Sequence, residues 1–188
     1  MKHYSVLKQE SLEYLNILED GIYVDATLGY GGHSEEILKK LTTGMLYAFD
    51  KDLEAIAFST ERLSNISNRF HIIHSDFANM KEELFALGVK NVDGILFDLG
   101  VSSPQIDSTE RGFSFMREEN LDMRMDQTNS KSAKVVVNEY LMERLTEIFY
   151  RYGEEKQSHR IAKVICDERE KKEITTTTQL VEIIQKAV

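Results

Sequence analysis

Cysteine, proline and tryptophan are nearly absent from this chain of 188 residues, which has one cysteine, one proline and no tryptophan. The single cysteine, Cys166, excludes an intrachain disulfide and a cysteine-rich zinc site. No apolar stretch reaches the roughly 20 residues needed to cross a membrane, and the first residues lack the apolar run of a signal peptide. We therefore expect a cytoplasmic protein that does not enter the membrane.

Basic residues are also fewer than acidic ones. The chain has 23 lysines and arginines and 32 aspartates and glutamates, which gives a formal net charge of -9. Phosphate binding depends on lysine and arginine, so this balance argues against a surface that coats nucleic acid broadly. The segment 131–172 is rich in lysine and arginine but also in glutamate. It is either a solvated helical face of mixed charge or a local contact for RNA, and both interpretations stay open.

Apolar runs alternate with helical patterns over the first hundred residues, and this alternation predicts βαβ units with a parallel sheet. The predicted strands are 22–24, 45–49, 70–73 and 92–97. The predicted helices between them are 35–41, 53–63 and 80–87. The fold class is therefore α/β.

Helical periodicity dominates after Asp126, with an amphipathic stretch over 141–152 that stops at Gly153 and another helix around 161–165. Thr176 and Gln179 have the spacing of a capping box ahead of a last helix. We predict a sheet domain over 1–105, a loop that shapes the active site over 106–130, and a helical domain over 131–188.

The run from Val92 to Asp126 is the most distinctive part of the chain and reads VDGILFDLGVSSPQIDSTERGFSFMREENLDMRMD. A strand pattern ends at Asp98, and a loop with Ser102, Ser103 and the only proline follows. In open α/β sheets, ligands bind just beyond the carboxyl ends of the strands. The position of Asp98 therefore predicts a role in a binding or active site.

Three more strand ends carry groups that suit a nucleotide-like ligand. The first strand leads into DATLGYGGHS (25–34), whose glycines allow a ligand to approach the backbone. Asp50 ends the second strand, where a carboxylate commonly accepts hydrogen bonds from ribose hydroxyls, and Asp76-Phe77 ends the third. The pattern fits a dinucleotide or S-adenosylmethionine, and its departure from Gly-x-Gly-x-x-Gly favours S-adenosylmethionine.

These motifs resemble those of the bacterial small-subunit ribosomal RNA (cytosine-N4)-methyltransferases. The resemblance covers nearly the whole chain and includes VDATLGYGGHS, FDKD, SDF, DLGVSSPQ, RGFSFM, LDMRMD, RYGEEK and ITTTTQLVEII. It implies a class I S-adenosylmethionine-dependent methyltransferase fold, Rossmann-like, with a helical insertion domain. It also implies methylation of cytidine N4 in the decoding region of the small-subunit RNA.

The resemblance implies cofactor contacts at seven positions, which are Gly31, Gly32, His33, Asp50, Phe77, Asp98 and Gln105. One departure concerns length. Members of the family are longer, and the strands that complete their sheet after the helical insertion are absent from these 188 residues. The fourth predicted strand should then lie at an edge of the sheet, where a partner or the chain's own helices would have to cover it.

Methyl transfer to an amine needs hydrogen-bond acceptors near the nucleophile, and Asp98, Ser102 and Ser103 are the candidate catalytic residues. Phe113 and Phe115 either stack on an unpaired base or fix the loop to the core. Arg111 and Arg124 either touch the substrate or hold the loop through local ion pairs. The histidines show no metal-ligand spacing, and we expect no metal site.

Two other hypotheses stay open from the sequence alone. A nicotinamide-dependent oxidoreductase would use a similar sheet, although the glycine spacing speaks against it. A non-catalytic module that binds RNA or protein is compatible with the absent strands. The expected partner of the enzyme is small-subunit ribosomal RNA or the assembled subunit, and a homodimer is compatible with the sequence.

Overall fold

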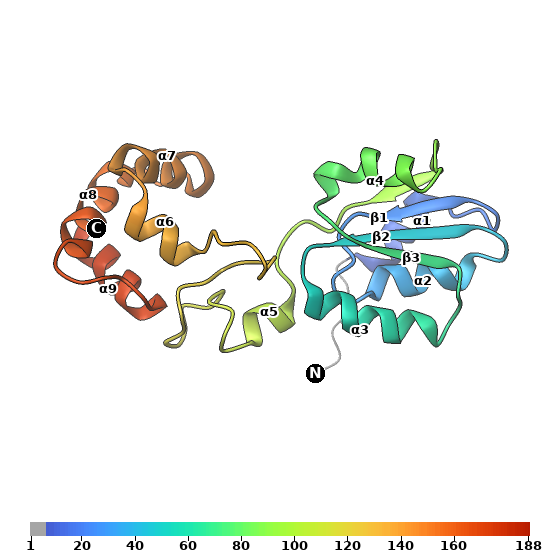
Figure 1. The fold of residues 1–188 in the computed structure, drawn as a ribbon, viewed down its shortest axis with the longest axis horizontal. Helices are drawn as coiled ribbons and strands as arrows, with labels where there is room; N and C mark the ends of the chain where they lie inside the picture. Colours follow the sequence, from blue (N-terminus) through green and yellow to red (C-terminus); the bar gives the residue numbers. More distant parts are fainter. Residues whose placement is uncertain (1–6) are drawn as a thin grey trace. The chain divides into compact units, whose positions relative to one another are not determined.

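The computed structural model describes residues 7–188, and contacts between residues divide the chain into two compact units, Met1–Ser102 and Ser103–Val188. The first unit holds the β-sheet and the second is helical (Figure 1). Each unit has its own hydrophobic core, so each is described by itself.

The first unit is built on a four-stranded sheet in the order β3-β2-β1-β4. The strands are β1 (Ile22–Asp25), β2 (Met45–Asp50), β3 (Phe70–His74) and β4 (Gly94–Leu96). All three pairings are parallel, with Asp25 opposite Ala48 and Leu96, and Asp50 opposite His74. This order matches the first four strands of the Rossmann fold, so the predicted α/β class and Rossmann-like sheet are confirmed.

Helices cover both faces of this sheet, which explains why its strands read as nearly continuous apolar runs. Leu46 and Ala48 of β2 face a core that includes residues of α1 (Lys8–Leu15), α2 (Gly32–Lys40) and α3 (Leu53–Ser64). Phe49 faces the other core, with Met80 and Leu84 of α4 (Met80–Ala86). A short 3₁₀ helix, η1 (Phe77–Asn79), leads into α4.

The fourth strand is shorter than the sequence predicts and lies at an edge of the sheet. Only Gly94–Leu96 pair with β1, whereas the apolar pattern extends from Val92 to Phe97. Ile95 remains 41% exposed and Phe97 50% exposed. The predicted edge position is confirmed, and its cover by a partner stays a prediction.

The second unit contains α5 (Ser103–Asp107), α6 (Ala133–Glu139), α7 (Met142–Gly153), α8 (Ser158–Arg169) and α9 (Thr177–Ala187). Its core includes Leu121, Leu145, Ile161 and Ile165. The predicted capping box is confirmed, because Thr176 and Gln179 satisfy each other's backbone amides at the start of α9. Helix α1 was not predicted from the sequence, and a loop was predicted where α5 lies. Helix α6 was predicted within the helical domain, without its bounds.

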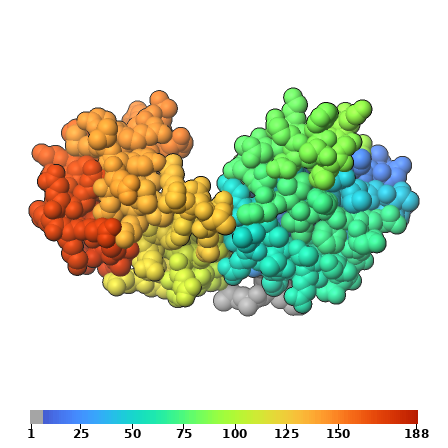
Figure 2. Space-filling model, viewed as in Figure 1, coloured from blue at the N-terminus to red at the C-terminus, as the bar shows by residue number. Residues whose placement is uncertain are grey.

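The loop between α5 and α6 is held by the helical part of the chain. Asn120 forms an isolated antiparallel bridge with Thr176, and Glu119 N donates to Thr177 Oγ1 at 3.1 Å. Figure 2 shows the yellow loop continuous with the orange and red helices. The contacts thus place residues 106–130 in the same unit as the helices, while the three-part division at 105 and 130 stays a prediction.

Within residues 7–188, no helix has the length and apolar character needed to cross a membrane.

Candidate active site

The carboxyl ends of the four strands lie at one edge of the sheet, because all of the strands run parallel. Asp25 and Asp50 are the last residues of β1 and β2, and Asp76 and Asp98 come two residues after β3 and β4. Four carboxylates thus gather at the edge where ligands bind in open α/β sheets.

The glycine loop after β1 is fixed by its neighbours in a shape that needs glycine. Gly29 N donates to Asp50 Oδ2 at 2.7 Å, and Ser59 Oγ donates to Gly29 O at 2.8 Å. Gly31 has φ of 75°, and a Cβ there would lie 3.0 Å from Ser59 Oγ. That approach is closer than ordinary carbon contacts, so both the backbone conformation and the packing against Ser59 favour glycine at this position.

Asp50 organises the loop and keeps capacity for a ligand. Its Oδ1 accepts from the amides of Lys51 and Asp52 at 2.7 and 2.9 Å, and its Oδ2 accepts from Gly29 N. A carboxylate offers roughly four acceptor positions. The geometry therefore leaves about one position for a hydroxyl group of a ligand.

Asp25 is a functional candidate that the sequence analysis placed at a strand end without giving it a role. Its side chain is 1% exposed, and it accepts from Ser34 Oγ at 2.7 Å and from Thr27 N at 3.1 Å. Both partners lie in the segment between β1 and the first turn of α2, so Asp25 ties the glycine loop to the sheet. The only sequence signal was a carboxylate at a strand end followed by a helix-start serine, which many loops share.

Burial raises the pKa of Asp25 above its ordinary 3.8, and the hydrogen bonds from Ser34 and Thr27 oppose this shift. The folded protein therefore binds this proton more tightly than the unfolded chain. The contribution of Asp25 to the free energy of unfolding is complete below pH 3.8 and is lost as the pH rises through the folded-state pKa.

Asparagine at position 25 keeps the shape of the side chain without its titration. We expect the stability of the wild type relative to Asp25→Asn to decrease as the pH rises above about 4. Urea unfolding of both proteins over a pH series measures this difference. A difference that stays constant with pH, or one that grows as the pH rises, would contradict the assignment.

Two aromatic rings lie at the ends of β3 and β4. Phe77 is 36% exposed, and its ring meets that of Phe97 edge to face with centroids 5.5 Å apart. The Asp76 carboxylate beside them caps η1 and pairs with Lys51 Nζ at 2.8 Å, and this lysine lowers the pKa of Asp76. The rings thus offer apolar surface for a planar group, while the Asp76 carboxylate serves the local structure.

Asp98 and His33 meet at the same edge. His33 Nε2 lies 3.5 Å from Asp98 Oδ2, and the Asp98 side chain is 47% exposed whereas that of His33 is 7% exposed. His33 Nδ1 is buried and has no hydrogen-bond partner within residues 7–188. Ser102 is half-buried and follows Asp98 in the same unit.

The remaining predicted site residues belong to the second unit. Gln105 lies buried on α5, and Ser103 is exposed at the start of that helix. Phe113 is half-buried, with the guanidinium of Arg111 5.8 Å from the centre of its ring, and Phe115 is 73% exposed. That these residues meet Asp98 stays a prediction.

Arg111 and Arg124 have partners inside the loop itself. Arg111 is 2% exposed and donates to the carbonyls of Arg124 and Met125 at 3.0 and 3.3 Å. Arg124 pairs with Asp122 at 2.6 Å and donates to Asn129 O at 2.8 Å. Of the two interpretations left open by the sequence, these contacts support bracing of the loop, and contact with the substrate stays a prediction.

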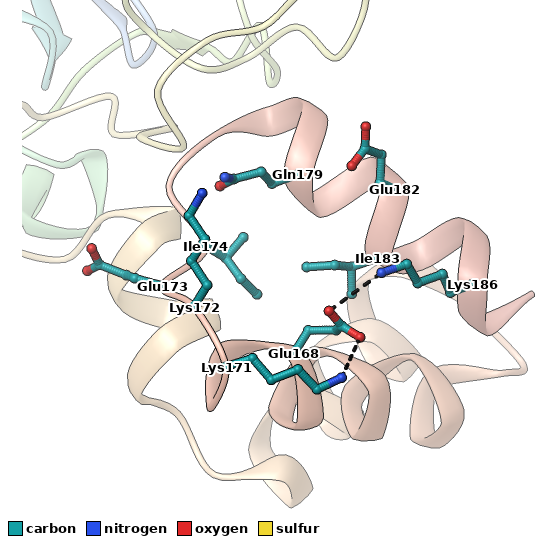
Figure 3. A pocket seen from close by; sticks show the side chains of 9 residues that line it. All are labelled: Glu168, Lys171, Lys172, Glu173, Ile174, Gln179, Glu182, Ile183 and Lys186. Carbon is teal, nitrogen blue, oxygen red and sulfur yellow. Dashed lines mark hydrogen bonds and ion pairs between the residues drawn. The ribbon is translucent and has the colours of Figure 1, made fainter.

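A pocket also lies between the end of α8, the segment that follows it and α9 (Figure 3). Ile174 and Ile183 are apolar residues of its lining. The Glu168 carboxylate forms ion pairs with Lys171 at 3.0 Å and with Lys186 at 3.5 Å. The three glutamates and three lysines that line this pocket balance in charge, and we assign it no ligand.

The sheet edge suits a ligand that combines a nucleoside with a charged, polar group. Asp50 can accept a hydrogen bond from a ribose hydroxyl, and the rings of Phe77 and Phe97 can pack against a base. His33 Nδ1 is buried and has no partner among the described residues 7–188, so it marks a polar site at the glycine loop that a ligand or a water molecule would satisfy. The residues present thus fit a cofactor that contains a nucleoside.

The model of the MraW methylase family matches residues 1–188 of this chain. The chain belongs to the MraW methylase family. Three relatives are each named Ribosomal RNA small subunit methyltransferase H, from Exiguobacterium sibiricum, Oceanobacillus iheyensis and Clostridioides difficile, and they are 57%, 53% and 51% identical to it.

The alignments with these three relatives cover 100%, 100% and 99% of this chain. They cover 60%, 58% and 60% of the relatives, so the chain spans about three-fifths of their length. Membership of the family confirms the resemblance stated from the motifs.

Proposed function

We propose that this protein transfers a methyl group from S-adenosylmethionine to N4 of a cytidine in the RNA of the small ribosomal subunit. The observation that carries the proposal is the meeting of the glycine loop, Asp50 and Asp98 at one sheet edge, in a chain of the MraW methylase family. The names of the relatives support ribosomal RNA as the substrate, and the motif resemblance supports cytidine N4.

Bound S-adenosylmethionine supplies an electrophilic methyl group on a positively charged sulfur. Gly31, Gly32 and His33 would hold its amino-acid part near the start of α2. Asp50 would accept from a ribose hydroxyl and Phe77 would cover the base, with Gln105 as a further contact. These roles use the glycine turn that precedes α2, the spare acceptor position of Asp50 and the exposed ring of Phe77.

Asp98 is the proposed catalytic residue because cytosine N4 is a poor nucleophile whose lone pair is delocalised into the ring. A carboxylate that accepts a hydrogen bond from the amine makes that lone pair more available. The nitrogen–carbon bond would form as the bond between the methyl carbon and sulfur breaks, with the thioether as the leaving group. N4 must then lose one proton, and Asp98 would accept it at a carboxylate oxygen. The hydroxyls of Ser102 and Ser103 would offer further acceptors to the amine.

The loop between α5 and α6 is the proposed contact for the RNA. Phe115 exposes a ring on which an unpaired base could stack, and Phe113 would support it. Arg111 and Arg124 would act on the substrate through the loop that they brace. We propose the free RNA or the assembled small subunit as the partner and the cytoplasm as the location.

Nucleoside mass spectrometry tests this function. The longest form of the protein that its gene encodes is incubated with S-adenosylmethionine and small subunits that lack the modification. We expect N4-methylcytidine to appear at one position of the RNA. A methyl group on another base, or no transfer to either free RNA or subunits, would overturn the proposal.

A further inference from the structure

Asp98 is held at two points by the segment that follows β1. Its backbone amide donates to Thr27 Oγ1 at 2.7 Å, and its Oδ2 lies 3.5 Å from His33 Nε2. Thr27 lies in the loop after β1 and His33 is the second residue of α2. The segment that follows β1 thus contacts both the backbone and the side chain of Asp98, which lies 71 positions after Thr27 in the sequence.

His33 is buried in a way that orients its ring. Asp98 faces Nε2, whereas Nδ1 has no hydrogen-bond partner within residues 7–188. A neutral imidazole carries one proton, and a carboxylate opposite Nε2 favours the tautomer with the proton on Nε2. Asp25, at the end of β1, is another acidic group near His33, and the electrostatic effect of His33 opposes the rise that burial causes in the pKa of Asp25.

We propose that His33 and Thr27 are positioning residues that fix the Asp98 carboxylate toward the substrate amine. The assignment of the amine as the target rests on the proposed function. A proton on His33 Nε2 would face Asp98 Oδ2 across the 3.5 Å contact, which leaves the other carboxylate oxygen to accept from the amine. Thr27 fixes the position of the Asp98 backbone after the end of β4, because its Oγ1 accepts the hydrogen bond from Asp98 N. A histidine that merely filled space would not orient this carboxylate.

Imidazole nitrogen NMR tests the contact without any need for activity. Long-range proton–nitrogen spectra of the wild type should show His33 with its proton on Nε2. In Asp98→Ala this preference should weaken, while Asp20→Ala, at an exposed position in the same unit, should leave the His33 signals unchanged. Unchanged His33 signals in Asp98→Ala would overturn the contact.

Methyl-transfer kinetics test the positioning role. Misplacement of a reacting group by about 1 Å can cost roughly 10²-fold in rate. We expect kcat to fall by up to about 10²-fold in His33→Gln and in Thr27→Val, with KM for the RNA little changed. Thr27→Val keeps the shape of the side chain, so it still tests the role if His33→Gln fails to fold. The exposed His159→Gln is the matched control.

The outcomes separate the two proposals. Unchanged kcat in both variants, or a rise confined to KM for S-adenosylmethionine, would overturn the positioning role while the function stands. A wild type that transfers no methyl group would overturn the function, and the nitrogen spectra would then decide the contact by themselves.

Discussion

Replacement of Asp98 by asparagine is expected to lower kcat for methyl transfer by roughly 10²–10⁴-fold, the range that a positioned general base contributes. Asparagine has the same shape and can still accept a hydrogen bond from the amine, but it cannot take up the proton that N4 loses. Because Asp98 N is held by Thr27 at 2.7 Å, the substitution should leave the backbone in place. Single-turnover methylation of small subunits measures the effect.

The control for this experiment is Asp167→Asn, which changes an exposed carboxylate on α8. It should retain the wild-type rate. Retention of the wild-type rate by Asp98→Asn would exclude Asp98 from any essential part in proton transfer. Asp98→Asn could instead bind the cofactor more weakly and keep the wild-type single-turnover rate when the cofactor is saturating. That result would show that Asp98 contributes to cofactor binding and not to proton transfer.

Replacement of Leu145 by alanine is expected to destabilise the helical unit by about 2–5 kcal/mol. Leu145 on α7 is fully buried in the core that also contains Ile161 and Ile165. The cores of the sheet unit share no residue with it. The loss should therefore be confined to the unit Ser103–Val188.

Hydrogen exchange resolved along the chain measures this confinement. Amides of α7, α8 and α9 should lose protection in Leu145→Ala, whereas those of β1 and β2 should keep it. Leu141→Ala is the matched control, because Leu141 is 73% exposed and should change stability by less than about 0.5 kcal/mol. An equal loss of protection in the strands would show that the units unfold together.

Much of the sheet unit was predictable because short apolar runs in the sequence mark its buried strands. Apolar runs that end in Asp25, Asp50 and Asp98 predicted three strand ends that the structure places at one edge. The fourth strand was predicted too long, since apolar residues at Val92 and Phe97 pack or lie exposed without pairing in the sheet. An apolar pattern in the sequence indicates which residues are buried. It does not show how far a strand extends, because a strand residue also needs a partner on the neighbouring strand.

Helix ends were less predictable than helices. Gly153 was expected to stop α7, and the helix does end there. The left-handed residue, however, is Glu154 with φ of 51°, so glycine is the last helical residue and an L-residue takes the turn. Propensity alone cannot assign this, because the fold around the helix end decides which residue bears the strain.

The site was predicted better by residue type than by role. Arginine has the same chemistry for a phosphate and for a backbone carbonyl, so sequence alone could not separate contact with RNA from the bracing seen at Arg111. The link between Asp98 and the pair Thr27 and His33 joins residues more than sixty positions apart. Only the parallel pairing of β1 with β4 brings them together.

The alternative hypotheses differ in the ligand that they assign to the sheet edge. A nicotinamide-dependent oxidoreductase would bind NAD there, and a non-catalytic module would bind neither NAD nor S-adenosylhomocysteine. The family of the chain is one of methylases, which favours the methyl-transfer product as the ligand. The choice of ligand is therefore the most direct test of the account.

Calorimetric titration with S-adenosylhomocysteine and, separately, with NAD is the measurement that decides it, made on the longest form of the protein that its gene encodes. We predict binding of S-adenosylhomocysteine, no binding of NAD, and a loss of about 1.5–3 kcal/mol in Asp50→Ala, the usual value of a hydrogen bond to a charged group. Binding of NAD instead, no binding of either ligand to the folded wild type, or unchanged affinity in Asp50→Ala would contradict the assignment of this edge.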